Sequence, residues 1–221
     1  MRIALAHLAL TTLGGTLDRA LRLLEEARAE GAGLVLFPEY LFGQTPYPEG
    51  VRALEEAARA LGIWVALGHL EAGQNRLSLL PQGPSYAKLH PYLDEPEVRP
   101  GEAPVLWQGF GLALCYDLDF PELFRSYALK GAEAFLVGAA WPGEYQDLLE
   151  VLARARAAEN QAYLFLANRK DTGSPSLAVR PDGRVLLRLE AEGVGVVELD
   201  RGFLEAYRAR YPILLHRRTD Y

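Results

Sequence analysis

The sequence of 221 residues has little sulfur and little lysine: one cysteine (Cys115), one methionine, and three lysines against twenty arginines. A single cysteine excludes an internal disulfide framework and suits a reducing compartment, so we expect a cytoplasmic protein. Low contents of Cys, Met and Asn are typical of thermophilic proteins, and we expect a thermophilic source.

Several other patterns are absent. No apolar run approaches the roughly 18 residues of a membrane helix, and His7 interrupts the short apolar N-terminus, unlike a signal peptide. A net charge of −6 argues against a nucleic-acid-binding protein. No metal-ligand or phosphate-loop pattern occurs, so we expect neither a metal nor a cofactor. No Gly-x-Ser-x-Gly occurs either, which argues against a serine hydrolase of the α/β-hydrolase type.

The residues that are present predict alternating strands and helices. In the first half we expect a strand up to Ala9 and a helix from an N-cap at Thr16 to Gly31. Further elements follow in the order strand, helix, strand, strand, strand, at 33–37, 49–61, 63–67, 77–80 and 85–90. The second half repeats the strand-helix order, and a short helix follows it; its elements are expected at 110–115, 121–130, 134–139, 144–160, 162–167, 176–180, 184–189 and 194–199.

Two similar α/β halves in one chain limit the fold. Half of the residues are apolar, and the continuous apolar strands indicate sheets that are buried on both faces. We therefore expect one α/β domain over residues 1–221, built as a four-layer α-β-β-α sandwich. A single doubly wound sheet is the alternative that the pattern leaves open.

Cys115 ends an apolar strand and precedes a polar, turn-prone stretch, the position where reactive groups collect in layered α/β proteins. A thiolate there would be a strong nucleophile, and the N-terminus of the helix at 121–130 would favour an anion beside it. The amide of Tyr116 could face a developing oxyanion. The alternative is a small core residue, the commonest role of a lone cysteine in an apolar run.

Glu39 and Lys88 also stand at strand ends. Burial would raise the carboxyl pKa of Glu39 and suit it to act as a general base. A lysine in a chain that otherwise uses arginine suits a compact charge that reaches a substrate oxygen. The alternatives are a solvated loop carboxylate and a solvated edge-strand lysine. His90 would share the strand face of Lys88, and we expect it to make a structural hydrogen bond.

Taken together, these segments resemble the nitrilase, or carbon–nitrogen hydrolase, superfamily. The glutamate, lysine and cysteine motifs of that family match Phe37-Pro38-Glu39, Tyr86-Ala87-Lys88-Leu89-His90 and Cys115-Tyr116-Asp117-Leu118-Asp119-Phe120-Pro121-Glu122. Three later motifs match Ala140-Trp141-Pro142, residues 153–161 and Ala167-Asn168-Arg169. The resemblance covers nearly the whole chain.

The resemblance implies a hydrolase that cleaves a small amide or N-carbamoyl compound through a thioester on Cys115 and releases ammonia. Glu39 would be the base, Lys88 and the Tyr116 amide would stabilise the oxyanion, and Trp141 would bind substrate. The resemblance also implies a homodimer, with residues 214–221 as a candidate arm. A non-catalytic binding or assembly module that kept the fold is the alternative.

The family uses a second glutamate between the lysine and the cysteine. Asp94, Glu95 and Glu97 lie in that interval, and we favour Glu95. Two features depart from the family pattern. The chain is short around residues 40–90 and 169–177, and Asp119 stands where many members carry Arg. An acidic group there would disfavour carboxylate substrates. Within the family, aliphatic amidase, ω-amidase, N-carbamoyl hydrolase and nitrilase activities all stay open.

Overall fold

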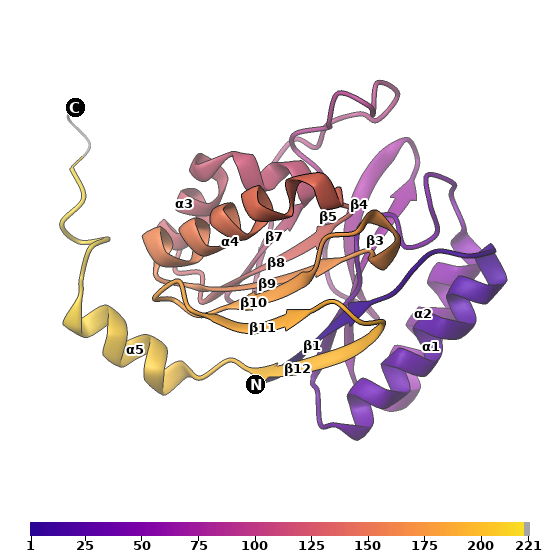
Figure 1. Ribbon diagram of the computed structural model, residues 1–221, viewed down its shortest axis with the longest axis horizontal. Coiled ribbons are helices and arrows are strands. Elements are labelled where there is room, and N and C mark those ends of the chain that lie inside the picture. The colour runs from indigo at the N-terminus through magenta and orange to yellow at the C-terminus, as the bar shows by residue number, and fades with distance from the viewer. Residues whose placement is uncertain (219–221) are drawn as a thin grey trace.

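Two six-stranded sheets pack face to face between two outer layers of helices (Figure 1). This computed structural model describes residues 1–218. The four-layer α-β-β-α sandwich is therefore confirmed, and the single doubly wound sheet is excluded.

The first sheet has the strand order β12-β1-β2-β3-β4-β5. Strands β1, β2 and β3 run parallel, whereas β4 and β5 are added as antiparallel hairpins. Helices α1 and α2 cover its outer face (Figure 1). The elements from this half of the chain are β1 (Arg2–His7), α1 (Leu13–Ala29), β2 (Leu34–Leu36), α2 (Pro48–Leu61), β3 (Trp64–Glu71), β4 (Gln74–Leu80) and β5 (Ser85–Ala87).

The second sheet has the order β11-β10-β9-β8-β7-β6, with β7, β8 and β9 parallel. Helices α3 and α4 cover its outer face (Figure 1). Its elements are β6 (Leu106–Trp107), β7 (Phe110–Leu114), α3 (Pro121–Leu129), β8 (Ala134–Ala139), α4 (Gln146–Asn160), β9 (Tyr163–Asn168), β10 (Ser176–Val179) and β11 (Val185–Leu189). Three 3-10 helices connect them, namely η1 (Cys115–Asp119), η2 (Gly143–Tyr145) and η3 (Lys170–Thr172).

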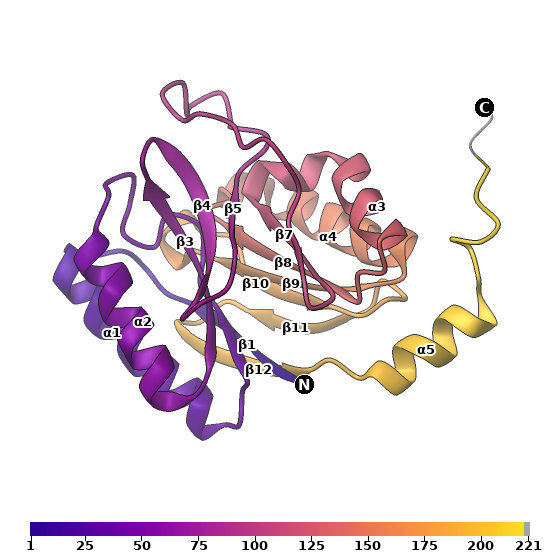
Figure 2. The ribbon, with the colours of Figure 1, turned by 180° about the vertical axis from the view of Figure 1, so that it is seen from behind.

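The two halves are not separate repeats, because the last strand changes sheets. Strand β12 (Gly193–Glu198) pairs antiparallel with β1, with Val196 opposite Ala4. The chain then forms α5 (Arg201–Arg210), which lies at the opposite end of the molecule from α1 and α2 (Figure 2). The second half of the chain thus supplies an edge strand of the first sheet.

Some predicted boundaries differ from the structure. The strand expected at 85–90 ends at Ala87, which leaves Lys88 and His90 beyond it, and the helix expected to follow an N-cap at Thr16 begins earlier. Helix α1 begins at Leu13, and its N-cap is Thr12, whose Oγ1 accepts a hydrogen bond from the Gly15 amide at 3.1 Å. Thr16 lies inside the helix, where its buried Oγ1 accepts from the Thr11 amide at 3.0 Å. Two glycines in the first turn are poor helix formers and hide this start from the sequence pattern.

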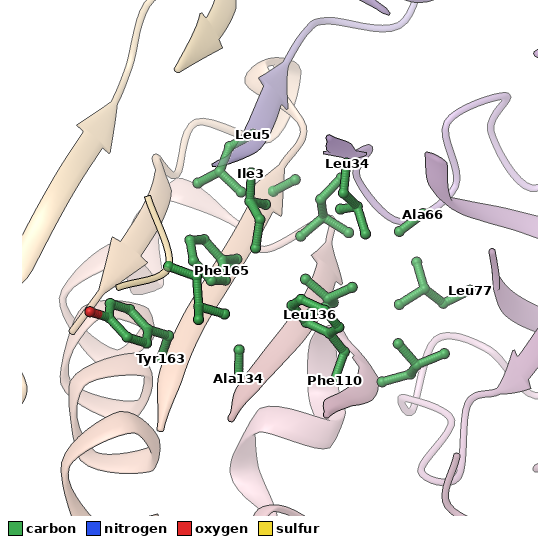
Figure 3. Close-up of a cluster of buried hydrophobic side chains, with 14 of the residues drawn as sticks. Ile3, Leu5, Leu34, Ala66, Leu77, Phe110, Ala134, Leu136, Tyr163 and Phe165 are labelled. Carbon is green, nitrogen blue, oxygen red and sulfur yellow. The ribbon is translucent and has the colours of Figure 1, made fainter. Parts of the chain in front are cut away.

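The space between the sheets is filled by apolar side chains from both inner faces. Ile3, Leu34 and Ala66 from the first sheet point toward Leu136 and Phe165 from the second, and all five are fully buried (Figure 3). Burial of this kind is the main favourable contribution to folding, and it fixes how the two sheets face each other. Among residues 1–218, no helix is long and apolar enough to cross a lipid bilayer.

Two glycines let the turn after β2 lie close to both sheets. A methyl group on Gly68 of β3 would lie 2.4 Å from the Pro38 carbonyl oxygen and 2.6 Å from the Glu39 Cα. A methyl group on Gly138 of β8 would lie 3.2 Å from the Glu39 amide nitrogen. The position of Glu39 therefore depends on having glycine, which has no side chain, at these two strand positions.

We predict that Gly68→Ala lowers the free energy of unfolding by about 1–3 kcal/mol, because the added methyl group displaces backbone. It should also reduce turnover, because the Glu39 turn moves. Denaturant unfolding and an ammonia-release assay measure the two effects. Gly14→Ala in α1 is the matched control, since nothing lies within 4 Å of its added methyl group. A Gly68→Ala protein that matches the wild type in both assays would show that this close approach is unimportant.

Candidate active site

Cys115 follows β7 directly and is the first residue of η1. Its φ is +43°, in the left-handed region that non-glycine residues seldom adopt. Such backbone strain occurs often at functional sites, where the surrounding structure holds it in place. Cys115 is partly buried as a residue and lines a cavity of about 540 Å³. Cys115 is therefore not a core residue but faces a pocket.

Asp117 holds the turn at Cys115. Its fully buried carboxylate accepts hydrogen bonds from the Leu114 amide at 2.9 Å and the Tyr86 hydroxyl at 2.7 Å. It also accepts from the amide of His90 at 3.1 Å, and His90 Nδ1 lies 2.8 Å from the same oxygen. The cysteine turn of the second sheet is thereby joined to the segment that carries Lys88.

His90 makes the expected structural contact but for a different reason. Strand β5 ends at Ala87, so the alternation of strand faces that we used to place His90 beside Lys88 does not apply. The imidazole instead stacks on Phe120, with ring centroids 3.6 Å apart, and bonds to Asp117.

Lys88 lies between two buried carboxylates. Its Nζ donates to Glu39 Oε1 at 2.9 Å and to Glu95 Oε2 at 2.7 Å. Glu39, Lys88 and Glu95 are 2%, 1% and 7% exposed, so this ion cluster is shielded from water. The structure brings Glu95 into contact with Lys88, whereas Glu97 is exposed and Asp94 lines the outer pocket.

Further donors fix the two carboxylates in place. Asn75 Nδ2 donates to Glu39 Oε1 at 2.7 Å and to Glu95 Oε1 at 3.1 Å. The Tyr40 hydroxyl and the Tyr92 amide donate to Glu95. Sequence reasoning missed Asn75 and Tyr40. Asn75 lies within β4, where nothing in its neighbours indicates function, and Tyr40 carries no signal beyond its place after Glu39.

The pKa directions separate the roles of the two glutamates. Burial raises the pKa of Glu39, and the charge of Lys88 offsets this only in part. Burial acts on Glu95 in the same direction, but Lys88 and the hydrogen bonds from Tyr40 and Tyr92 lower the pKa of Glu95 overall. Glu95 is thus the permanent carboxylate of the cluster, and Glu39 is the carboxylate that can accept a proton.

Burial also acts on Lys88 and Cys115. It lowers the pKa of Lys88, but the charges of Glu39, Cys115 and Glu95 outweigh it, so the net pKa is raised and the ammonium persists. Burial and the Glu39 charge raise the pKa of Cys115 well above 9.0, despite Lys88. The thiol is therefore protonated near neutral pH, and the Glu39 carboxylate that acts on its pKa is the base to which the proton can pass.

Tyr116 and Trp141 both line the cavity, as the sequence predicts. Tyr116 is the second residue of η1, and the first amides of a helix have no acceptor within it. Trp141 is held by its indole N–H, which donates to the Tyr145 carbonyl at 3.0 Å, and by its own amide, which donates to Asn168 Oδ1 at 2.7 Å. Asn168 belongs to the family motif Ala167-Asn168-Arg169, but the sequence does not indicate its role in holding Trp141.

Within residues 1–218, no group of three or more His, Cys, Asp or Glu side chains is placed to hold a metal ion. The arrangement instead combines a thiol, a carboxylate base and a buried ammonium at the floor of one pocket. This combination is suited to nucleophilic attack on a polarised carbon, followed by stabilisation of an oxyanion.

Comparison with known proteins agrees with this geometry. Residues 2–209 match the family model "Carbon-nitrogen hydrolase", and the chain belongs to that family. It is 35% identical to an (R)-stereoselective amidase from Pseudomonas sp. over 85% of this chain and 74% of that protein. It is 31% identical to human deaminated glutathione amidase over 90% of this chain and 76% of that protein.

Solved structures give the same assignment. An amidase from Nesterenkonia sp. superposes with a TM-score of 0.78 at 30% identity, covering 96% of this chain and 95% of that one. A glutamate-to-glutamine mutant of the same amidase, with a TM-score of 0.77 at 29% identity over 96% and 98% of the two chains, shows Michael addition of acrylamide at its active-site cysteine.

We predict that Lys88→Met lowers the free energy of unfolding by about 3–5 kcal/mol, because two buried carboxylates lose their shared cation. It should reduce turnover by about 10²–10³-fold through loss of an oxyanion donor. Urea unfolding and an ammonia-release assay measure these effects.

Lys130→Met is the control, since Lys130 is exposed at the end of α3. The double variant Glu39→Gln/Lys88→Met should recover part of the stability but none of the activity. Near-normal turnover of a good substrate by Lys88→Met would remove Lys88 from the mechanism.

Proposed function

We propose that this protein is an amidase that hydrolyses a small amide through a thioester on Cys115, with Glu39 as general base and Lys88 as oxyanion donor. One observation carries the proposal. The only cysteine of the chain shares a cavity with a buried carboxylate of raised pKa, and Oε1 of that carboxylate lies 2.9 Å from a buried ammonium nitrogen.

In the first half-reaction, Glu39 takes the thiol proton and the sulfur attacks the amide carbon. An ammonium group has three donors, and Glu39 and Glu95 accept two of those of Lys88. The third is available to the oxygen that becomes negative, together with the Tyr116 amide. Glu39 then gives its proton to the departing nitrogen, so ammonia leaves and an acyl thioester remains on Cys115.

In the second half-reaction, Glu39 takes a proton from water, which attacks the thioester carbon. The same donors stabilise the second oxyanion. Collapse of this intermediate releases the carboxylic acid, and the proton held by Glu39 returns to the sulfur. Glu95 keeps its charge throughout and holds Lys88 in position, because its pKa is lowered.

The similar proteins support this proposal. They include amidases that act at carbon–nitrogen bonds, and the Nesterenkonia amidase variant is a relative in which the active-site cysteine itself reacts. The alternative, a non-catalytic binding or assembly module, is not favoured, since the similar proteins include amidases and all three proposed catalytic side chains line one cavity. Activity on N-carbamoyl compounds remains part of the proposal.

Self-association as a homodimer is a further part of the proposal, with the C-terminal segment as the arm. Leu215 in that segment and Ile213 just before it are exposed apolar residues, which supports it. Thr219, Asp220 and Tyr221 of the predicted arm lie outside the described residues. A cytoplasmic location, a thermophilic source and the lack of a nucleic-acid partner stay predictions from composition.

We predict that kcat/KM falls at low pH as Glu39 becomes protonated. Because burial raises the pKa of Glu39, the midpoint of this fall should lie above the ordinary glutamate value of 4.5. A pH–rate profile measures it, with circular dichroism at each pH to confirm that the protein stays folded. A midpoint at or below 4.5 would contradict the assignment of Glu39 as the buried base.

We predict that Cys115→Ala abolishes ammonia release, because no other cysteine exists to form the thioester. In the wild-type protein, mass spectrometry of rapidly quenched reactions should find the acyl group on the peptide that contains Cys115. Hydroxylamine should divert the same intermediate to a hydroxamate. Ammonia release by Cys115→Ala at the wild-type rate would refute the nucleophile assignment.

A further inference from the structure

One carboxylate in the pocket has no role in the mechanism above. Asp119 is the last residue of η1 and lines the same cavity as Cys115. Its Oδ2 is buried and has no hydrogen-bond partner, and it is the only such carboxylate oxygen among residues 1–218. A buried acceptor without a donor is costly, so native proteins seldom leave one unsatisfied.

No neighbouring cation satisfies Asp119. Arg156 is the nearest source of positive charge that acts on its pKa, but its guanidinium donates to the Leu118 carbonyl at 3.0 Å and to Glu159 at 3.0 Å. Within residues 1–218, Asp119 has no ion pair within 4.0 Å. Burial accordingly raises the pKa of Asp119 more than Arg156 lowers it.

The remaining charges of the pocket favour a positive group over a negative one. Four carboxylates line the cavity, against the cations Lys88 and Arg169. Lys88 is held by Glu39 and Glu95, and Arg169 makes a two-point ion pair with Asp171. A substrate carboxylate would therefore find both cations already paired, whereas a substrate cation would find Asp119 unpaired.

The aromatic lining of the cavity also favours a cationic substrate. Tyr92, Tyr116, Trp141 and Tyr145 line it. Aromatic rings attract cations through the negative charge of their faces, and the attraction is stronger where water is excluded.

We propose that Asp119 is a specificity-determining residue and that the pocket selects amides carrying a cationic group, such as a primary ammonium, at the end of a short chain. The proposal rests on the proposed amidase function and names its substrate class. Cys115 and Asp119 are four residues apart in η1, which is about 8 Å along the axis of a 3-10 helix. The cation would therefore lie several bonds from the amide carbon that the sulfur attacks.

A matched series of three primary amides tests the proposal. 5-Aminopentanamide, hexanamide and adipic acid monoamide share four methylene groups beyond the amide and end in an ammonium, a methyl group and a carboxylate. For the wild-type protein, we expect kcat/KM to be about 10- to 100-fold higher for the ammonium compound than for hexanamide, the usual range for a hydrogen-bonded charged group. The carboxylate compound should be the poorest substrate.

Asp119→Asn keeps the shape of the side chain and removes its charge. It should reduce the ratio of kcat/KM between the ammonium compound and hexanamide to within about threefold of one. Asp18→Asn removes the same charge from an exposed position on α1 and should leave that ratio as in the wild type. This control separates contact with Asp119 from the overall negative charge.

Binding measurements keep the test independent of turnover. The Kd values of the same three compounds for Cys115→Ala and for Cys115→Ala/Asp119→Asn, measured by calorimetry, should show the same preference and the same loss. Equal or tighter binding of hexanamide than of the ammonium compound by Cys115→Ala would overturn the proposal, and so would a ratio that Asp119→Asn leaves unchanged. Wild-type protein that binds the ammonium compound selectively but turns over none of the three would instead count against the proposed function.

Discussion

The site depends on one buried ammonium group shared by two carboxylates. Taking Lys88 and its partners out of water is costly, and the cost is offset only if every charge is paired and hydrogen-bonded. Glu39 and Glu95 supply the pairing, while Asn75, Tyr40 and Tyr92 supply the remaining hydrogen bonds. The cluster therefore fixes the position of the base, and the base fixes the proton path to Cys115.

This cluster joins parts of the chain that the two sheets bring together. Glu39, Asn75 and Lys88 come from the first sheet, whereas Cys115 follows β7 of the second. Asp117 bonds to both sides of this junction, through Leu114 on one and Tyr86 and His90 on the other. The apolar packing between the sheets (Figure 3) thus bears on catalysis, because it sets how the segment that carries Glu39 lies relative to the segment that carries Cys115.

The residue types at strand ends made the main site residues predictable from the sequence. Cys115, Glu39 and Lys88 each follow a short strand, and the periodicity predicted two similar α/β halves with buried sheets, which allowed the four layers but left one doubly wound sheet open. The supporting residues were not predictable, because Asn75 and Tyr40 become important only when a distant Glu95 folds against them. Sequence reasoning also missed the pairing of β12 with β1 of the first sheet and the start of α1 after its N-cap Thr12. Both depend on contacts, strand pairing and helix capping, that the spacing of apolar residues does not reveal.

The protonation state of Lys88 tests the central claim most directly. The chain has only three lysines, so ¹³C labelling of lysine Cε gives three NMR signals, and Lys88→Met identifies the one from Lys88. The account predicts that this signal remains that of an ammonium above pH 10.5, the ordinary lysine value, because the charges around it raise its pKa. Loss of the Lys88 proton below pH 10.5 in the folded protein would contradict it.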